Sequence, residues 1–223
     1  MIYFISKKNQ WSKFLFEKLK NCGDYFWYSD DSYKAKLTEE KPEWLFFFHW
    51  SKIVPKEIYE NYKCVVIHTG NFPKDRGGSP LQNQILKKQF KSRVNLIEMG
   101  SDIDAGDVYC SLPITLYGSL TDIWLAISET SFELINRCVK ENMIPKPQEG
   151  VPSFFKRRKP KDSLLNFSNC DNILEIHKFI QMLDAEGYPN AYYDIGDYRL
   201  HFSRSSLTSG EVVLADVKIG KKK

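Results

Sequence analysis

Two short segments hold the residues whose types and spacing suit proton transfer. The first, CVVIHTGNFPKDRGGSP over residues 64–80, is an apolar run that ends on His68 and continues into a loop rich in glycine and proline. The second, MGSDIDAGDVY over residues 99–109, places Asp104 in a tight turn. A histidine titrates near neutrality, so it can take a proton from an amine and return it to a leaving group, while a carboxylate orients the imidazole. His68 and Asp104 are therefore the candidate catalytic pair for an acyl transfer.

The elements around this pair must bring it together. The apolar residues before His68 predict a buried strand over 64–68, whose carboxyl end is where ligands of open α/β sheets gather. Short strands over 95–99 and 107–111 are expected to flank the Asp104 turn. The alternative is a structural histidine at a strand end and an aspartate that only caps a turn. The neighbouring RGG-x-P loop and D-A-G-D turn favour the functional interpretation.

These segments resemble the folate-dependent formyltransferases. In that family a histidine is followed by proline after five residues, by Arg-Gly after eight and nine, by proline after twelve, and later by an Asp-x-Gly turn. The matching residues are His68, Pro73, Arg76, Gly77, Pro80, Asp104 and Gly106. Three further segments resemble the sugar N-formyltransferases of surface-polysaccharide pathways: HWS at 49–51, RGGSPLQN at 76–83 and MLDAEGYP at 182–189.

The resemblance implies an enzyme that moves a formyl group from 10-formyltetrahydrofolate to the primary amine of a nucleotide-linked amino sugar, with no metal. It also implies that the enzyme is cytoplasmic and that it takes part in polysaccharide biosynthesis. The pterin is expected to lie near Asp104 and against one loop. That loop comprises Trp50, Ser51, Lys52, Ile53 and Val54. The acceptor is expected near the residues Arg76, Gly77, Gly78 and Gln82. Arg76 has a second interpretation, in which it braces its own loop.

One position departs from the family pattern. The family has an asparagine two residues before the histidine, and that asparagine helps to hold the formyl oxygen; here the residue is Val66. Losing one oxyanion donor can cost on the order of 3 kcal/mol of transition-state stabilisation. His49 and Asn71 are the candidate replacements, and each is equally open to a structural interpretation.

Two other activities are compatible with these residues. A hydrolase of formyl-folate would use the same pair with water as the acceptor. A non-catalytic folate-binding protein of the same fold is made conceivable by Val66. Formylation of an amino acid, as in a peptide synthetase, is a weaker variant of the transferase hypothesis.

Composition and charge limit the classes to which this protein can belong. The chain has 223 residues, of which 42% are hydrophobic, enough for a substantial core. No stretch reaches the roughly 20 apolar residues that span a membrane, so no membrane partner is expected. The five cysteines form no CxxC pair, which predicts free thiols and not a disulfide framework. The net charge of +4 is concentrated in FKRRKPK at 155–161 and in the terminal lysines, and is interpreted as a solvated connector or as attraction for a polyanion.

The order of predicted elements indicates a doubly wound, mainly parallel α/β sheet of the Rossmann-like formyltransferase type. Strands alternate with helices up to a long amphipathic helix over 120–141. A connector rich in proline and glycine over 144–152 predicts a catalytic domain of residues 1–150 and a small C-terminal α+β extension of residues 151–223. The extension is expected to hold a helix and three antiparallel strands. Transfer-RNA formyltransferases carry a larger C-terminal domain, so a nucleic-acid partner is not expected.

Overall fold

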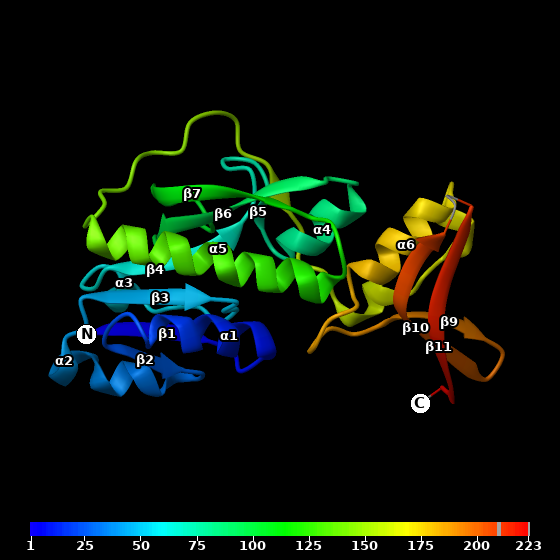
Figure 1. Cartoon of the computed structure of the whole chain (residues 1–223), viewed down its shortest axis with the longest axis horizontal. Helices are drawn as coiled ribbons and strands as arrows, with labels where there is room; N and C mark the ends of the chain where they lie inside the picture. The colour runs from blue at the N-terminus through cyan, green and yellow to red at the C-terminus, as the bar shows by residue number, and fades with distance from the viewer. Residues whose placement is uncertain (209–210, 223) are drawn as a thin grey trace. The chain divides into compact units, whose positions relative to one another are not determined.

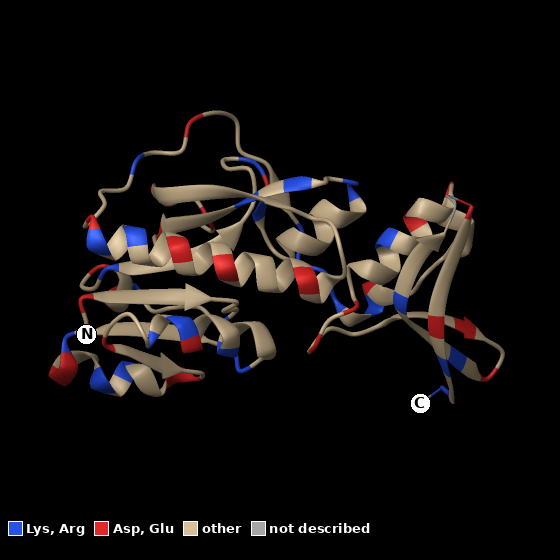
Figure 2. Ribbon diagram, in the orientation of Figure 1, with Lys and Arg blue, Asp and Glu red and all other residues tan. Residues whose placement is uncertain are grey.

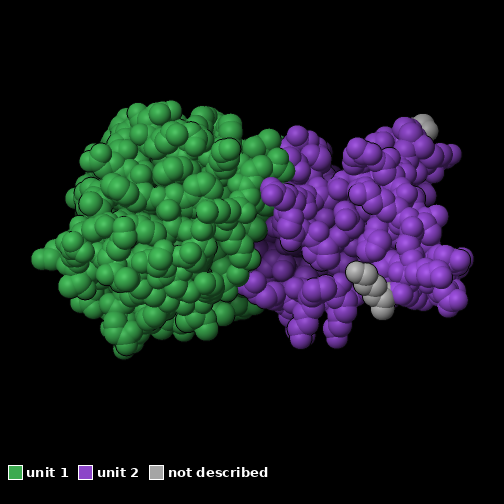
Figure 3. All heavy atoms as spheres, turned by 90° about the horizontal axis from the view of Figure 1, so that it is seen from below, with its two compact units in different colours: residues 1–77, 91–115, 124–154 green, residues 78–90, 116–123, 155–223 purple. Residues whose placement is uncertain are grey.

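The computed structural model describes residues 1–208 and 211–222, and the chain divides into two compact units (Figure 3). Unit 1 comprises residues 1–77, 91–115 and 124–154, and unit 2 comprises residues 78–90, 116–123 and 155–223. The domain boundary at residue 150 stays a prediction.

Unit 1 is built on a six-stranded sheet of order β2-β1-β3-β4-β6-β7 (Figure 1). Its strands are β1 (Ile2–Ser6), β2 (Tyr25–Tyr28), β3 (Trp44–Phe48), β4 (Cys64–Thr69), β6 (Lys91–Glu98) and β7 (Val108–Thr115). The first four run parallel to one another. The predicted mainly parallel α/β fold is confirmed.

The last two strands of this sheet are antiparallel to their neighbours. β6 runs against β4, with Thr69 opposite Val94 and Val65 opposite Glu98, and β7 runs against β6. Only the residues 99–107 join β6 to β7, too few for the crossover that parallel neighbours need. The turn that carries Asp104 therefore leaves the sheet beside Val65, near the start of β4.

Successive side chains of the parallel strands point to opposite faces, and both faces of the sheet are apolar. Tyr3, Ile5, Leu45 and Phe47 belong to one buried cluster. The cluster also contains Tyr33, Leu37, Val54, Ile58 and Cys64. The intervening Phe4 and Phe48 contact each other on the opposite face, with ring centroids 6.0 Å apart. Both faces must be covered, which explains why the strands are almost continuously apolar.

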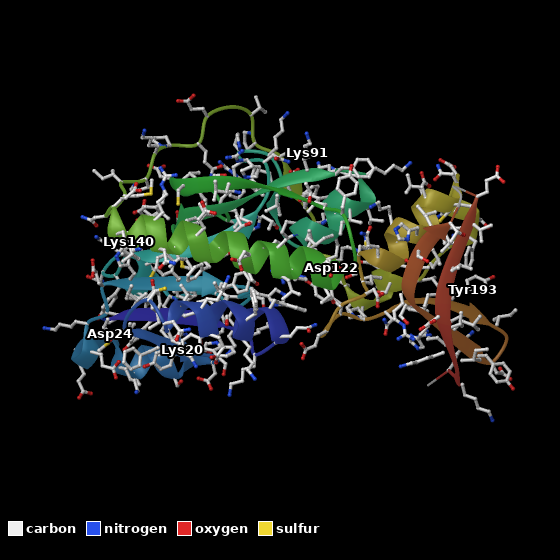
Figure 4. All side chains as sticks on the ribbon, in the orientation of Figure 1. Lys20, Asp24, Lys91, Asp122, Lys140 and Tyr193 are labelled. Atoms are coloured by element: carbon white, nitrogen blue, oxygen red, sulfur yellow. The ribbon has the colours of Figure 1, made fainter. Side chains whose placement is uncertain are left out.

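Helices cover both faces. On the side of Phe48 lie α1 (Gln10–Leu19) and α5 (Leu120–Lys140), which touch where Trp11 stacks on Trp124 with centroids 5.3 Å apart. Asn9 caps α1 by accepting a hydrogen bond from the Ser12 amide. In α5, Asp122 lies in the first turn and Lys140 is the last residue, as the helix dipole favours (Figure 4). The opposite face carries the short helices η1 (Asp31–Lys36), α2 (Leu37–Glu40) and α3 (Lys56–Tyr59).

Unit 2 contains the three antiparallel strands that were predicted, in the order β11-β10-β9. These are β9 (Ala191–Ile195), β10 (Tyr198–Thr208) and β11 (Val212–Lys221). Helix α6 (Ile173–Gln181) packs against β10 and β11 and also lies beside α4 (Pro80–Leu86), where Lys88 pairs with Glu175 at 2.7 Å. Two short 3-10 helices complete the unit: η2 (Pro160–Ser163) and η3 (Phe167–Asn169).

Within the described ranges, none of the helices has the length and apolar character required to cross a lipid bilayer. All five cysteines are free thiols. The described residues contain no group of His, Cys, Asp and Glu side chains arranged to hold a metal ion.

Candidate active site

The structure brings His68 and Asp104 together. His68 is the fifth residue of β4, and its Nε2 lies 3.2 Å from Oδ2 of Asp104. Both side chains are largely buried, with 11% and 13% of their surface exposed. Because β6 ends beside Val65, the loop 99–107 must return along β4 to bring the carboxylate to His68. The meeting of the pair thus depends on the path of this loop, not on a common strand edge.

A glycine backbone completes the pair. The amide of Gly77 donates a hydrogen bond to Asp104 Oδ2 at 2.8 Å, while the Gly77 carbonyl oxygen lies 3.4 Å from His68 Nε2. Gly77 has a φ of 97°, a left-handed conformation that glycine adopts without strain. The backbone at this turn therefore holds both members of the pair.

The hydrogen bonds define the chemistry of the His68 ring. Its Nε2 faces a carboxylate and a carbonyl, both acceptors, so this nitrogen carries a proton. Its Nδ1 is buried and has no hydrogen-bond partner among the residues described. The ring stacks on Phe72, with centroids 5.2 Å apart and an interplanar angle of 24°. His68 Nδ1 thus has unused hydrogen-bonding capacity in its buried position.

The charge state of Asp104 follows from competing effects. Burial raises the pKa of this carboxyl, but the hydrogen bond and charge of His68, the Gly77 amide and the Arg76 charge together lower it below its usual range. Asp104 is therefore ionised at neutral pH and can stabilise a positively charged His68 imidazole.

Arg76 is engaged with a neighbouring side chain. Its Nε and Nη2 donate to Oε1 of Gln148 at 3.2 and 2.8 Å, and its guanidinium lies over the Phe154 ring. Arg76 therefore connects its loop to the segment after α5, and its role toward an acceptor stays a prediction. Gln148 was not among the residues that the sequence singled out, because an isolated glutamine in a proline-rich connector carries no pattern.

A buried polar network on β6 and β7 holds the carboxyl end of β4. The Asn95 side chain on β6 donates to the carbonyl oxygens of Gly70 and His68, at 2.8 and 3.3 Å. Its Oδ1 accepts from the Ser111 hydroxyl, which in turn accepts from Arg93 Nε, both at 2.7 Å. Sequence reasoning missed this network, since a single polar residue in an apolar strand gives no indication of its partners.

His49 lies in an aromatic pocket of unit 1. Its ring packs edge-on against Trp124 and Trp11, with centroids 4.8 and 5.8 Å away. Because Asn9 Oδ1 accepts from the Ser12 amide, the Asn9 amide nitrogen donates to His49 Nδ1 at 3.1 Å. This contact places the ring proton on Nε2. Burial, with a smaller contribution from the charge of Lys7, lowers the pKa of His49 to about 4.

We expect His49 to make the protein acid-sensitive. The unfolded chain protonates this residue below a pKa of about 6.5, whereas the folded chain protonates it only near 4. Since the unfolded state binds more protons in this window, stability falls as the pH drops from about 6.5 towards 4. Replacement His49→Gln should reduce the stability loss between pH 7 and pH 5 by about 2 kcal/mol. Urea unfolding at both pH values measures this, and an unchanged loss in the variant would contradict it.

The other predicted catalytic residue, Asn71, is tied into its own loop. Its backbone amide and its side-chain amide both donate to Oδ2 of the buried Asp75, at 3.3 and 3.2 Å. Asn71 thus shapes the segment after β4.

The predicted folate loop is divided between core and surface. Val54 is buried, and Trp50 packs against the same cluster, near Tyr33 and Phe47. Lys52 pairs with Asp31 at 2.6 Å, whereas Ser51 and Ile53 are exposed, Ile53 by 92%. The binding of folate by these residues stays a prediction.

Two predicted acceptor-site residues belong to unit 2. A Cβ on Gly78 would lie 2.5 Å from Cβ of Arg157, so glycine permits this close approach. Gln82 is buried on α4. Their role toward an acceptor stays a prediction, as does that of Gly77 and Arg76.

Residues 160–220 match a family model described as the C-terminal domain of methionyl-tRNA formyltransferase. A methionyl-tRNA formyltransferase of Campylobacter jejuni is 27% identical over 150 residues, covering 66% of this chain and 49% of the relative. The chain thus spans about half the length of this curated relative.

Solved structures extend the comparison. A protein from Clostridium thermocellum described as methionyl-tRNA formyltransferase is 35% identical, with a TM-score of 0.92 and full coverage of both chains. A sugar N-formyltransferase from Shewanella has a TM-score of 0.70 at 18% identity, covering 93% of this chain and 98% of that one. HypX from Aquifex aeolicus, solved in complex with tetrahydrofolic acid, has a TM-score of 0.80 at 19% identity, covering 95% and 40%. The last two show the fold alone.

This chain belongs to the folate-dependent formyltransferase family. The family resemblance seen in the sequence is thereby confirmed. The match over residues 160–220 also removes the reason for excluding an RNA acceptor, because that exclusion took the C-terminal domain to be missing.

Proposed function

We propose that this chain transfers a formyl group from 10-formyltetrahydrofolate to a primary amine, with His68 and Asp104 as the reacting pair. The observation that carries the proposal is the 3.2 Å contact between His68 Nε2 and Asp104 Oδ2. The pair lies in a chain of a family whose members use this co-substrate.

The pair moves one proton in two steps. As the amine nitrogen attacks the formyl carbon, the carbonyl electrons move onto oxygen, and the pair takes the proton that the amine must lose. Asp104 stabilises the resulting imidazolium through Nε2. His68 then returns the proton to the folate nitrogen as the bond between that nitrogen and the formyl carbon breaks. General acid-base catalysis of this kind contributes about 100- to 10,000-fold.

The oxyanion needs donors that Val66 does not supply. We favour His49 over Asn71 as the additional donor, because Asn9 places the ring proton of His49 on Nε2 while the Asn71 amide is directed to Asp75. Removal of one such donor costs on the order of 3 kcal/mol of transition-state stabilisation. The pterin is proposed to lie against the exposed part of the loop Trp50–Val54.

Two amines are candidates for the acceptor. The segments 76–83 and 182–189 favour the amine of a nucleotide-linked amino sugar, with a role in polysaccharide biosynthesis. The match over residues 160–220 and the relative of 35% identity favour the amino group of methionyl-tRNA. The basic segment 155–161 of unit 2 suits the phosphates of either acceptor (Figure 2).

A transfer assay tests the proposal. The protein is incubated with 10-formyltetrahydrofolate and either a panel of nucleotide-linked amino sugars or methionyl-tRNA, and formyl addition is scored by mass. We expect the product from one acceptor class only. Release of formate without any amine would favour the hydrolase. Tight folate binding with no product and no release would favour a non-catalytic folate-binding protein.

A further inference from the structure

Gln148 connects the two loops that make the candidate active site. It lies after α5, within the segment 144–152 that the sequence predicted to be a connector between domains. All four of its hydrogen bonds go to the Arg76 side chain or to the backbone of the Asp104 turn.

The amide of Gln148 is saturated and can have only one orientation. Its Oε1 accepts from Arg76 Nε and Nη2, at 3.2 and 2.8 Å. Its Nε2 donates to the carbonyl oxygens of Asp104 and Gly106, at 3.0 and 2.8 Å. A flipped amide would place oxygen against two carbonyls and hydrogens against a guanidinium, so the donors and acceptors define its orientation.

The segment that carries Gln148 is itself anchored on the loop after β4. Ser153 accepts bonds at its carbonyl oxygen from the Arg76 amide, at 3.0 Å, and at its hydroxyl from the Asp75 amide, at 3.2 Å. A Cβ on Gly150 would lie 3.4 Å from the Pro73 ring, so the backbone runs close over this loop. The segment that carries Gln148 is therefore held against the loop after β4 by the bonds that Ser153 accepts from the Asp75 and Arg76 amides.

We propose that Gln148 is a positioning residue for the His68–Asp104 pair. It holds the backbone of the Asp104 turn and, at the same time, keeps the Arg76 guanidinium at a place where its charge favours an ionised Asp104. The Gly77 amide and His68 Nε2 are the other groups directed at this carboxylate. The role rests on the proposed formyl transfer, because positioning has meaning only for a pair that reacts.

The test compares Gln148→Leu with Glu149→Leu, which also introduces a leucine, at an exposed position of the same segment. We expect Gln148→Leu to lower kcat by about ten- to 100-fold, as small misplacements of reacting groups do. KM for 10-formyltetrahydrofolate should change much less. The acid limb of the kcat/KM profile should move to higher pH, since Asp104 loses the nearby Arg76 charge. Glu149→Leu should behave as the wild type.

A second measurement does not depend on turnover. Carboxyl 13C shifts of Asp104, followed through a pH titration, should show a higher midpoint in Gln148→Leu than in the wild type and in Glu149→Leu. If the wild type formylates no acceptor, the proposed function fails, and this titration still tests whether Gln148 controls Asp104. Equal midpoints and equal pH profiles in both variants would overturn the positioning role, even if Gln148→Leu were less stable.

Discussion

Replacement of Asp104 by asparagine is expected to lower kcat/KM for formyl transfer by about 100- to 10,000-fold, the range of general acid-base catalysis. The amide side chain keeps the size of the carboxylate and an oxygen for the Gly77 amide, 2.8 Å away in the wild type. It removes the negative charge that stabilises the His68 imidazolium. His68→Asn should produce a loss of similar size, and the double variant should lose little more, because the two residues act as one unit.

The matched control for this prediction is Asp102→Asn. Asp102 lies in the same turn and is exposed, so the same loss of charge there should leave kcat/KM within about twofold of the wild type. Steady-state kinetics with 10-formyltetrahydrofolate and the acceptor identified by mass give the comparison. Wild-type rates in Asp104→Asn would remove the proposed pair from the chemistry.

Gly106→Ala is expected to have the largest effect on stability in the Asp104 turn. A Cβ at this position would lie 1.9 Å from the carbonyl oxygen of Glu98, which is backbone and has no rotamer by which to move away. The Glu98 amide also donates to the Asp107 carbonyl oxygen at 2.8 Å, which holds the two segments together. Overpacking of this kind costs about 1–3 kcal/mol or more, and the displaced turn should also slow transfer.

Gly100→Ala is the control for this prediction. It makes the same substitution in the same loop, at a position where a new Cβ would meet no atom within 4 Å. The free energy of unfolding, measured in urea, should fall strongly in Gly106→Ala and stay within about 0.5 kcal/mol of the wild type in Gly100→Ala. Equal stabilities for the two variants would show that the turn can relax around the added methyl group.

Many of the elements could be predicted from local pattern. The apolar run at 64–68 became β4 (Cys64–Thr69) within one residue, because strands buried on both faces need continuous apolar sequence. The helical spacing over 120–141 became α5, and the three antiparallel strands expected in the C-terminal extension are β9, β10 and β11. Helices η1 and α2 were missed, since the charged residues of 31–40 show little apolar periodicity.

The sequence by itself determined the fold class and the family, and it predicted His68 and Asp104 as the reacting pair, because apolar periodicity and spaced motifs are local properties of a chain. Only the tertiary structure decided that β6 reverses, that the Asp104 turn returns along β4 to reach His68, and that Gln148 joins this turn to Arg76. These contacts connect residues far apart in sequence, and their partners are chosen by the path of the backbone. The sequence around a single histidine, aspartate or glutamine does not predict that path.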